Sequence, residues 1–119
     1  MDRSSEVELS AAFGALSDAS RRQMLRLLLQ KPRRAGELAE CLDMSPQALS
    51  RHLRVLRKAG LVFEQGIERD ARVRVYSVHA TAFQPVQDYL AQVESLWRRQ
   101  LQAFKAFAEN PRRPGRLKE

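Results

Sequence analysis

The stretch Ser45–Lys58 carries side chains whose types and spacing could serve molecular recognition. It contains four cationic residues and no acid. On a helix, which turns by about 100° per residue, one side of this stretch carries Gln47, Arg51, Arg54 and Lys58, with Ser50 at its margin. Arginine and glutamine can each form two hydrogen bonds with the edge of one DNA base. The pattern therefore indicates a DNA-reading helix, or else a basic face that is simply solvated.

The residues around this face predict the helix that positions it. Ser45 is a natural helix N-cap, Pro46 suits the first helical position, and Gly60 lies just beyond the other end. Apolar residues recur at the helical spacing opposite the basic side, at Leu49, Leu53 and Leu56. The helix should bury this apolar stripe.

Size and charge restrict the class of protein. The chain has 119 residues, a net charge of +7 and a pI near 10.5, which favour one domain and an anionic partner such as DNA. We expect the folded domain to span 1–109 and the basic tail 110–119 to be disordered. The first residues lack a signal-peptide pattern, no apolar run reaches the roughly 20 residues that span a bilayer, and only one cysteine occurs. A cytoplasmic protein that does not enter membranes is predicted.

Upstream, the pattern predicts three helices. The first covers 6–16 and the third covers 35–42. The second begins after a cap at Ser17 or Asp18 and ends at about Leu29. It is apolar nearly all round and should be central. A short link then leads to Ser45, and the small Ala39 allows the flanking helices to cross closely. This spacing is that of a helix-turn-helix motif. Asp43 occupies the turn position where glycine is common, and aspartate tolerates unusual turn geometry.

Downstream of Gly60 the pattern becomes extended. A strand should begin at 61–63, a connection should cover 64–71, and a second strand should cover 72–78. A hairpin after a helix-turn-helix is a wing. Its basic residues are Arg69, Arg72 and Arg74. They could contact DNA phosphates, or they could protect an exposed sheet edge by their charge.

A long helix is predicted from about Thr81 to Glu109. Its apolar stripe consists of Phe83, Val86, Leu90, Val93, Trp97, Leu101 and Phe104. This stripe is longer than a domain of this size can cover, so a homodimer should bury it, although packing within one chain is the alternative. A pocket for a small-molecule inducer could also be lined by Phe83, Tyr89, Trp97 and Phe104, whereas ordinary dimer core is the simpler interpretation.

Three segments resemble the ArsR-type winged-helix transcriptional regulators: 16–22, 36–39 and 44–62, with the likeness continuing through 75–78. The resemblance implies a mainly α fold with a small β-hairpin, in which the first and last helices join a bacterial repressor into a homodimer on an operator. It adds Phe13 to the predicted dimer interface. The groove-facing positions that it implies are Ser45, Gln47, Ala48, Ser50, Arg51 and His52, with Arg54 nearby on the DNA backbone. His52 lies nearer the apolar stripe, so internal packing with one hydrogen bond is an equal alternative.

Other functions find less support in the residues. Metal-sensing members of the family carry a cysteine pair where this chain has Arg34 and Gly36, and the last helix here has no histidine. We therefore expect no metal or other cofactor.

Cys41 could act as a redox switch, but we expect a half-buried, inert thiol. No catalytic grouping is recognisable, so we predict that the chain is not an enzyme. A protein-interaction module that uses the last helix remains the alternative to DNA binding.

Overall fold

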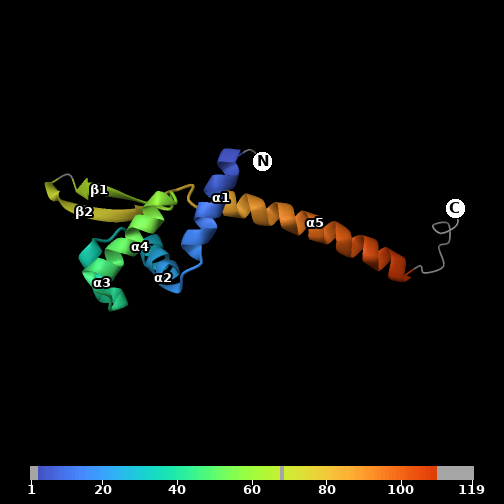
Figure 1. Cartoon of the computed structure of the whole chain (residues 1–119), viewed down its shortest axis with the longest axis horizontal. Coiled ribbons are helices and arrows are strands. Elements are labelled where there is room, and N and C mark those ends of the chain that lie inside the picture. The colour runs from blue at the N-terminus through green and yellow to red at the C-terminus, as the bar shows by residue number, and fades with distance from the viewer. Residues whose placement is uncertain (1–2, 68, 110–119) are drawn as a thin grey trace. The chain divides into compact units, whose positions relative to one another are not determined.

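A computed structural model describes residues 3–67 and 69–109, except for the side chain of Ala71. The elements, in order, are α1 (Arg3–Leu16), α2 (Ala19–Gln30), α3 (Ala35–Leu42), α4 (Pro46–Lys58), β1 (Val62–Ile67), β2 (Asp70–Val78) and α5 (Gln84–Glu109) (Figure 1). The chain forms two compact units, Met1–Val86 and Gln87–Glu119. The predicted mainly α fold with one antiparallel hairpin is confirmed. The prediction of a disordered tail over 110–119 lies outside the described residues.

The boundaries of α1, α5 and both strands differ from those predicted. α1 begins at Arg3 rather than at Glu6, and α5 begins at Gln84 because a turn, closed by the Gln84 N–H to Thr81 carbonyl bond of 3.2 Å, occupies 81–83. The long connection predicted over 64–71 was wrong. Strand pairing continues to Ile67 opposite Asp70, with an irregular register after Gly66. Backbone pairing in an exposed hairpin does not require apolar alternation, so the sequence pattern underestimated both strands.

The core of the first unit is assembled mainly from leucines of four helices. Met24, Leu38 and Leu56 are fully buried, and α2 packs against α1, α3, α4 and β2. The central position predicted for α2 is therefore confirmed. α2 is not buried on every side, because Leu29 is 60% exposed. The helix buries one stripe and leaves the other side to solvent.

A tight turn orders the helix-turn-helix. Asp43 adopts the left-handed conformation, with φ 52° and ψ 53°, and ends α3. The next residue, Met44, then donates its N–H to the Ala39 carbonyl at 2.9 Å. This is a common way to end a helix, and the residue in the left-handed conformation is usually glycine. Aspartate takes the place of glycine here, as the sequence led us to expect.

Cys41 is exposed, so the predicted half-buried thiol was wrong. α3 turns Leu38, Ala39 and Leu42 toward the core, and Cys41 lies outside this group on the helix surface. The chain contains no second cysteine that could pair with it within one molecule.

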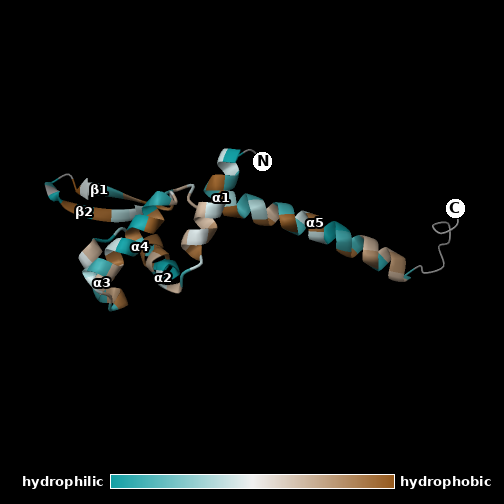
Figure 2. Ribbon diagram, in the orientation of Figure 1, coloured by the Kyte–Doolittle hydropathy of each residue, from teal (hydrophilic) through white to brown (hydrophobic). Residues whose placement is uncertain are grey.

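Most of α5 lies in the second unit. Its apolar residues alternate with polar ones along its length (Figure 2). Large apolar side chains are exposed, with Trp97 60% and Phe104 70% accessible. Among the described residues, no helix combines the length and apolarity required to cross a bilayer.

The N-cap of α2 should make the stability of the protein sensitive to acid. The Asp18 carboxylate accepts the Arg21 N–H at 3.1 Å, and this bond holds the pKa of Asp18 below its usual range. A lowered pKa in the folded state gives stability above the unfolded-state pKa, and this stability is lost as the pH falls through the folded-state value. We expect Asp18→Ser, which retains a capping oxygen that does not titrate, to lose less stability than wild type between roughly pH 5 and pH 2. Urea denaturation across this range measures the difference, and equal losses would contradict it.

Candidate nucleic-acid interface

The start of α4 is fixed by its cap. The Ser45 side chain accepts the Ala48 N–H at 3.1 Å, and Pro46 follows at the first helical position. Leu49, Leu53 and Leu56 are buried beneath the helix, as predicted. These contacts fix the rotation of α4 about its axis, and hence the direction of its outer face.

The outer face brings together most of the residues predicted to contact DNA. Four of them line one shallow depression of about 400 Å³, together with Pro46: Gln47, Ser50, Arg51 and Arg54. All four are exposed, as is Ser45, whereas Ala48 is half-buried. Within 3–67 and 69–109, no hydrogen bond or ion pair engages the side chains of these four residues. Their hydrogen-bonding groups are therefore available to an external partner.

The His52 side chain is held by a residue of α2. It is half-buried, and its Nδ1 lies 3.2 Å from a guanidinium nitrogen of Arg21 on α2. Because arginine can only donate, Nδ1 is the acceptor of this bond. The same guanidinium donates to the carbonyls of Ala15 at 2.8 Å and Gly14 at 3.2 Å, at the end of α1. Arg21 thus joins the end of α1 to the middle of α4.

In the wing, acidic residues hold two of the three predicted arginines. Arg72 bonds to Asp70 at 3.3 Å, and Arg74 bonds to one oxygen of Glu64 at 3.3 Å. The second oxygen of Glu64 pairs with Arg57 of α4, also at 3.3 Å. Arg69 lies in the turn and is exposed. Ion pairs this exposed contribute little to stability, so phosphate could compete with the carboxylates.

A backbone bridge fastens the wing to the helices. Tyr76 of β2 donates its N–H to the Arg33 carbonyl at 2.8 Å and accepts the Arg33 N–H at 3.2 Å. The base of the hairpin is thereby fixed to the link between α2 and α3.

Arg21, Glu64 and Arg57 are absent from the residues predicted for the site. Arg21 contacts His52 across 31 positions of sequence. No local pattern reports such a contact, although the position of Arg21 one turn after the cap Asp18 does indicate a residue near the start of a helix.

The residues predicted for a dimer interface fall into two groups. Phe83 and Val86 pack against the core of the first unit, so part of their surface is already buried within one chain. Phe13 and the α5 residues remain exposed in the single chain: Leu90, Val93, Trp97, Leu101 and Phe104. Within the described residues, no group of three or more His, Cys, Asp or Glu side chains could hold a metal ion.

Comparison with known proteins agrees with this arrangement. A profile described as bacterial regulatory protein, arsR family, matches residues 18–63, which extend from the cap of α2 into β1. The solved structure of an ArsR-like transcriptional regulator from Rhodococcus sp. RHA1 superposes with a TM-score of 0.77 and 31% identity, over 92% of this chain and 98% of that one. The chain belongs to the ArsR family.

Two curated relatives support the assignment to the ArsR family. The transcriptional repressor SdpR of Bacillus subtilis (strain 168) is 32% identical over 76 residues, which are 64% of this chain and 81% of that protein. The HTH-type transcriptional regulator Rv2034 of Mycobacterium tuberculosis (strain ATCC 25618 / H37Rv) is 35% identical over 94 residues, 78% of this chain and 81% of that protein. The chain is accordingly a DNA-binding transcriptional regulator with a winged helix-turn-helix fold, and not an enzyme.

Proposed function

We propose that the protein is a homodimeric repressor that binds an inverted-repeat operator, with α4 of each subunit in a major groove. The observation that carries this proposal is the outer face of α4, where Gln47, Ser50, Arg51 and Arg54 are exposed and have no partner among the described residues. The name of one relative, a transcriptional repressor, supports the direction of the regulation.

Within α4, two residues are best suited to read bases. Arg51 can donate two hydrogen bonds to guanine, and Gln47 can both donate to and accept from adenine. Ser45, Ala48, Ser50 and Arg54 surround them as contacts to the sugar-phosphate backbone or to base edges.

We assign His52 a supporting role on the protein side of α4. Its Nδ1 accepts a bond from Arg21, so only the other ring nitrogen could contact a phosphate. The main effect of His52 is to hold the rotation of α4.

The wing residues Arg69, Arg72 and Arg74 are proposed as phosphate contacts beside the helix. Arg69 can act directly. The other two must exchange a carboxylate for a phosphate, which is a moderate change because both ion pairs are exposed.

Dimerisation is proposed to bury the apolar row of α5 together with Phe13 of α1. An exposed apolar surface of this length is costly for a single chain in water. A two-fold dimer reads an inverted repeat, because each copy of α4 meets one half-site, and half-sites on one face of DNA lie about 34–36 Å apart.

Selection of bound sites from random duplex DNA tests this function. We expect an enriched inverted repeat, bound far more tightly than its scrambled version at physiological salt. Equal affinity for both sequences would remove the claim of a specific operator.

Arg51→Ala should then separate base reading from backbone contact. If Arg51 reads a base, its loss costs about 1–3 kcal/mol on the selected site and relaxes the preference at one base pair. Fluorescence anisotropy with the selected and scrambled duplexes measures both effects. Arg26→Ala is the control, because it removes the same charge from an exposed position on α2. A loss for Arg51→Ala that is uniform over all sequences would make this residue a phosphate contact.

A further inference from the structure

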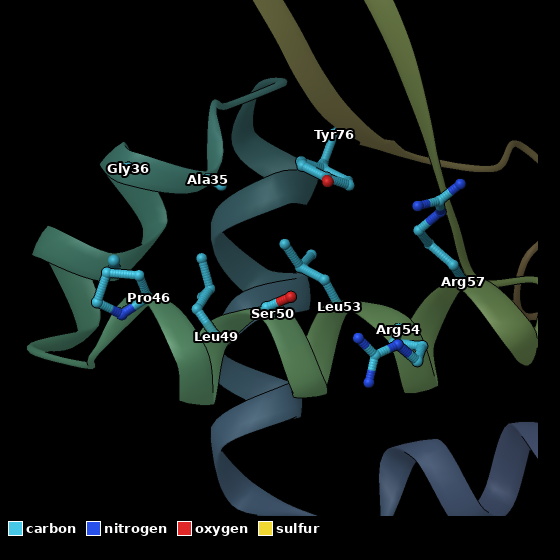
Figure 3. Close-up of a pocket in the computed structure, with 10 residues that line it drawn as sticks. Ala35, Gly36, Pro46, Leu49, Ser50, Leu53, Arg54, Arg57 and Tyr76 are labelled. Carbon is cyan, nitrogen blue, oxygen red and sulfur yellow. The ribbon is translucent and has the colours of Figure 1, made fainter.

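A cavity of about 230 Å³ lies between α3, α4 and β2 in the first unit (Figure 3). Pockets for drug-sized ligands are larger, roughly 300–1,000 Å³. This cavity therefore suits a small molecule, such as one ring with a short substituent.

One side of the cavity is apolar. Leu49 and Leu53 point into it from α4. Ala39 of α3 also contributes to its lining. The half-buried Tyr76 lies across from Leu53. A fully polar occupant, such as a bare phosphate, would lose hydration against this surface without any compensating contact. The chemistry of this side favours an apolar body.

The other side is polar and has an excess of positive charge. Ser50, Arg54 and Arg57 contribute to the lining. Arg57 and Arg74 share the carboxylate of Glu64, whereas Arg54 has no partner among the described residues. Two arginines thus line the cavity, and the one carboxylate that pairs with Arg57 is shared with Arg74, so the site attracts an anion and repels a cation.

Tyr76 adds a neutral wall to the cavity. Burial raises the pKa of Tyr76, and the charge of Glu64 and a hydrogen bond with its carboxylate raise it further. The phenol therefore stays protonated, with its hydrogen bond directed to Glu64.

We propose that this cavity binds a small apolar carboxylate, with its ring against Leu49 and Leu53 and its carboxylate toward Arg54, and that the bound ligand competes with DNA. The competition rests on the proposed function, because Ser50 and Arg54 line both the cavity and the depression on the outer face of α4. A ligand there would withdraw Arg54 from the operator, as expected of an inducer.

Benzoate is the probe, and its binding is measured without DNA by titration of the backbone amide signals in NMR spectra. We expect shifts around Gly36, Ser50 and Tyr76, with a dissociation constant of about 1 mM, as is usual for a ligand of roughly ten non-hydrogen atoms. Inorganic phosphate supplies the charge alone and benzyl alcohol the ring alone, so each should bind more weakly. No shifts with benzoate, or equal binding of phosphate, would overturn the proposal.

Two matched variants test the orientation of the ligand. Arg54→Gln should weaken benzoate binding roughly tenfold, because it removes a charge-assisted hydrogen bond. Arg51→Gln is the control: it removes the same charge from the next turn of the exposed face, and Arg51 does not line the cavity. Equal effects of the two changes would reduce the site to general attraction of anions and would overturn the assignment.

Displacement of a fluorescent duplex at low salt tests the competition. Benzoate should release DNA from the wild type at concentrations that saturate the NMR shifts, and benzyl alcohol should not. Retention of DNA at saturating benzoate would overturn the competition. If no duplex is bound at all, the proposed function fails, while the NMR titration still decides whether the cavity holds a carboxylate.

Discussion

Replacing Trp97 and Leu101 together with glutamate is expected to convert the protein into monomers and to lower operator affinity by about 10²- to 10⁴-fold, the range gained by linking two binding sites. Both side chains lie in the apolar row of α5, with Trp97 60% and Leu101 46% exposed in the single chain. Four carboxylates per dimer would have to be buried in the proposed interface, and burying unpaired charges is prohibitive. Each monomer would then present only one copy of α4 to DNA.

Sedimentation velocity and anisotropy with the selected operator measure the two effects. The matched control is Ser95→Glu with Gln102→Glu, which adds the same charge on the opposite side of α5, where both residues are exposed. The control should remain dimeric. Dimers that persist in the Trp97 and Leu101 variant would mean that the subunits associate through another surface, and monomers with full affinity would mean that α5 does not serve DNA binding.

The second large effect is expected at Arg21. Arg21→Ala removes bonds to the Gly14 and Ala15 carbonyls and to His52, so we expect the free energy of unfolding to fall by about 2–3 kcal/mol. Arg21→Lys should recover only part of this loss, because one ammonium group cannot span acceptors that the planar guanidinium reaches together. Operator affinity should fall as well, since α4 loses the contact that orients it.

Urea denaturation, followed by circular dichroism, measures the stability of each variant. Arg22→Ala is the control, because Arg22 is exposed and its side chain makes one hydrogen bond within the described part of the chain, to the Leu16 carbonyl at the end of α1 at 2.7 Å. We expect it to cost less than about 1 kcal/mol. Equal losses for the two alanine variants would show that the link between α1 and α4 contributes no more to the free energy of unfolding than a single exposed hydrogen bond.

The sequence predicted features that are encoded within a few residues. The cap at Ser45, the leucine stripe of α4 and the turn at Asp43 each depend on neighbours along the chain, and all three are present. The outer face of α4 follows from the same periodicity. For the same reason, the basic side chains of α4 could be placed before the fold was known.

Contacts between distant parts of the chain were not predictable in this way. The Arg21–His52 bond and the pairing of Glu64 with two arginines join separate elements, so no spacing rule reports them. The exposure of Cys41 depends on how far α3 is rotated against its neighbours, which the short apolar pattern of eight residues does not determine. The cavity beneath α4 arises only when three elements meet.

Glu64 gives the DNA-binding surface a counterion of its own. Each of its two carboxylate oxygens holds one arginine, Arg57 or Arg74, at 3.3 Å. If a DNA phosphate takes Arg74, as proposed, Glu64 keeps Arg57, and the new contact replaces an existing ion pair instead of adding to it. The net gain in free energy should therefore be smaller than for an arginine that has no carboxylate beside it. Such a contact should contribute little to binding that ignores sequence, which leaves discrimination between sites to the outer face of α4.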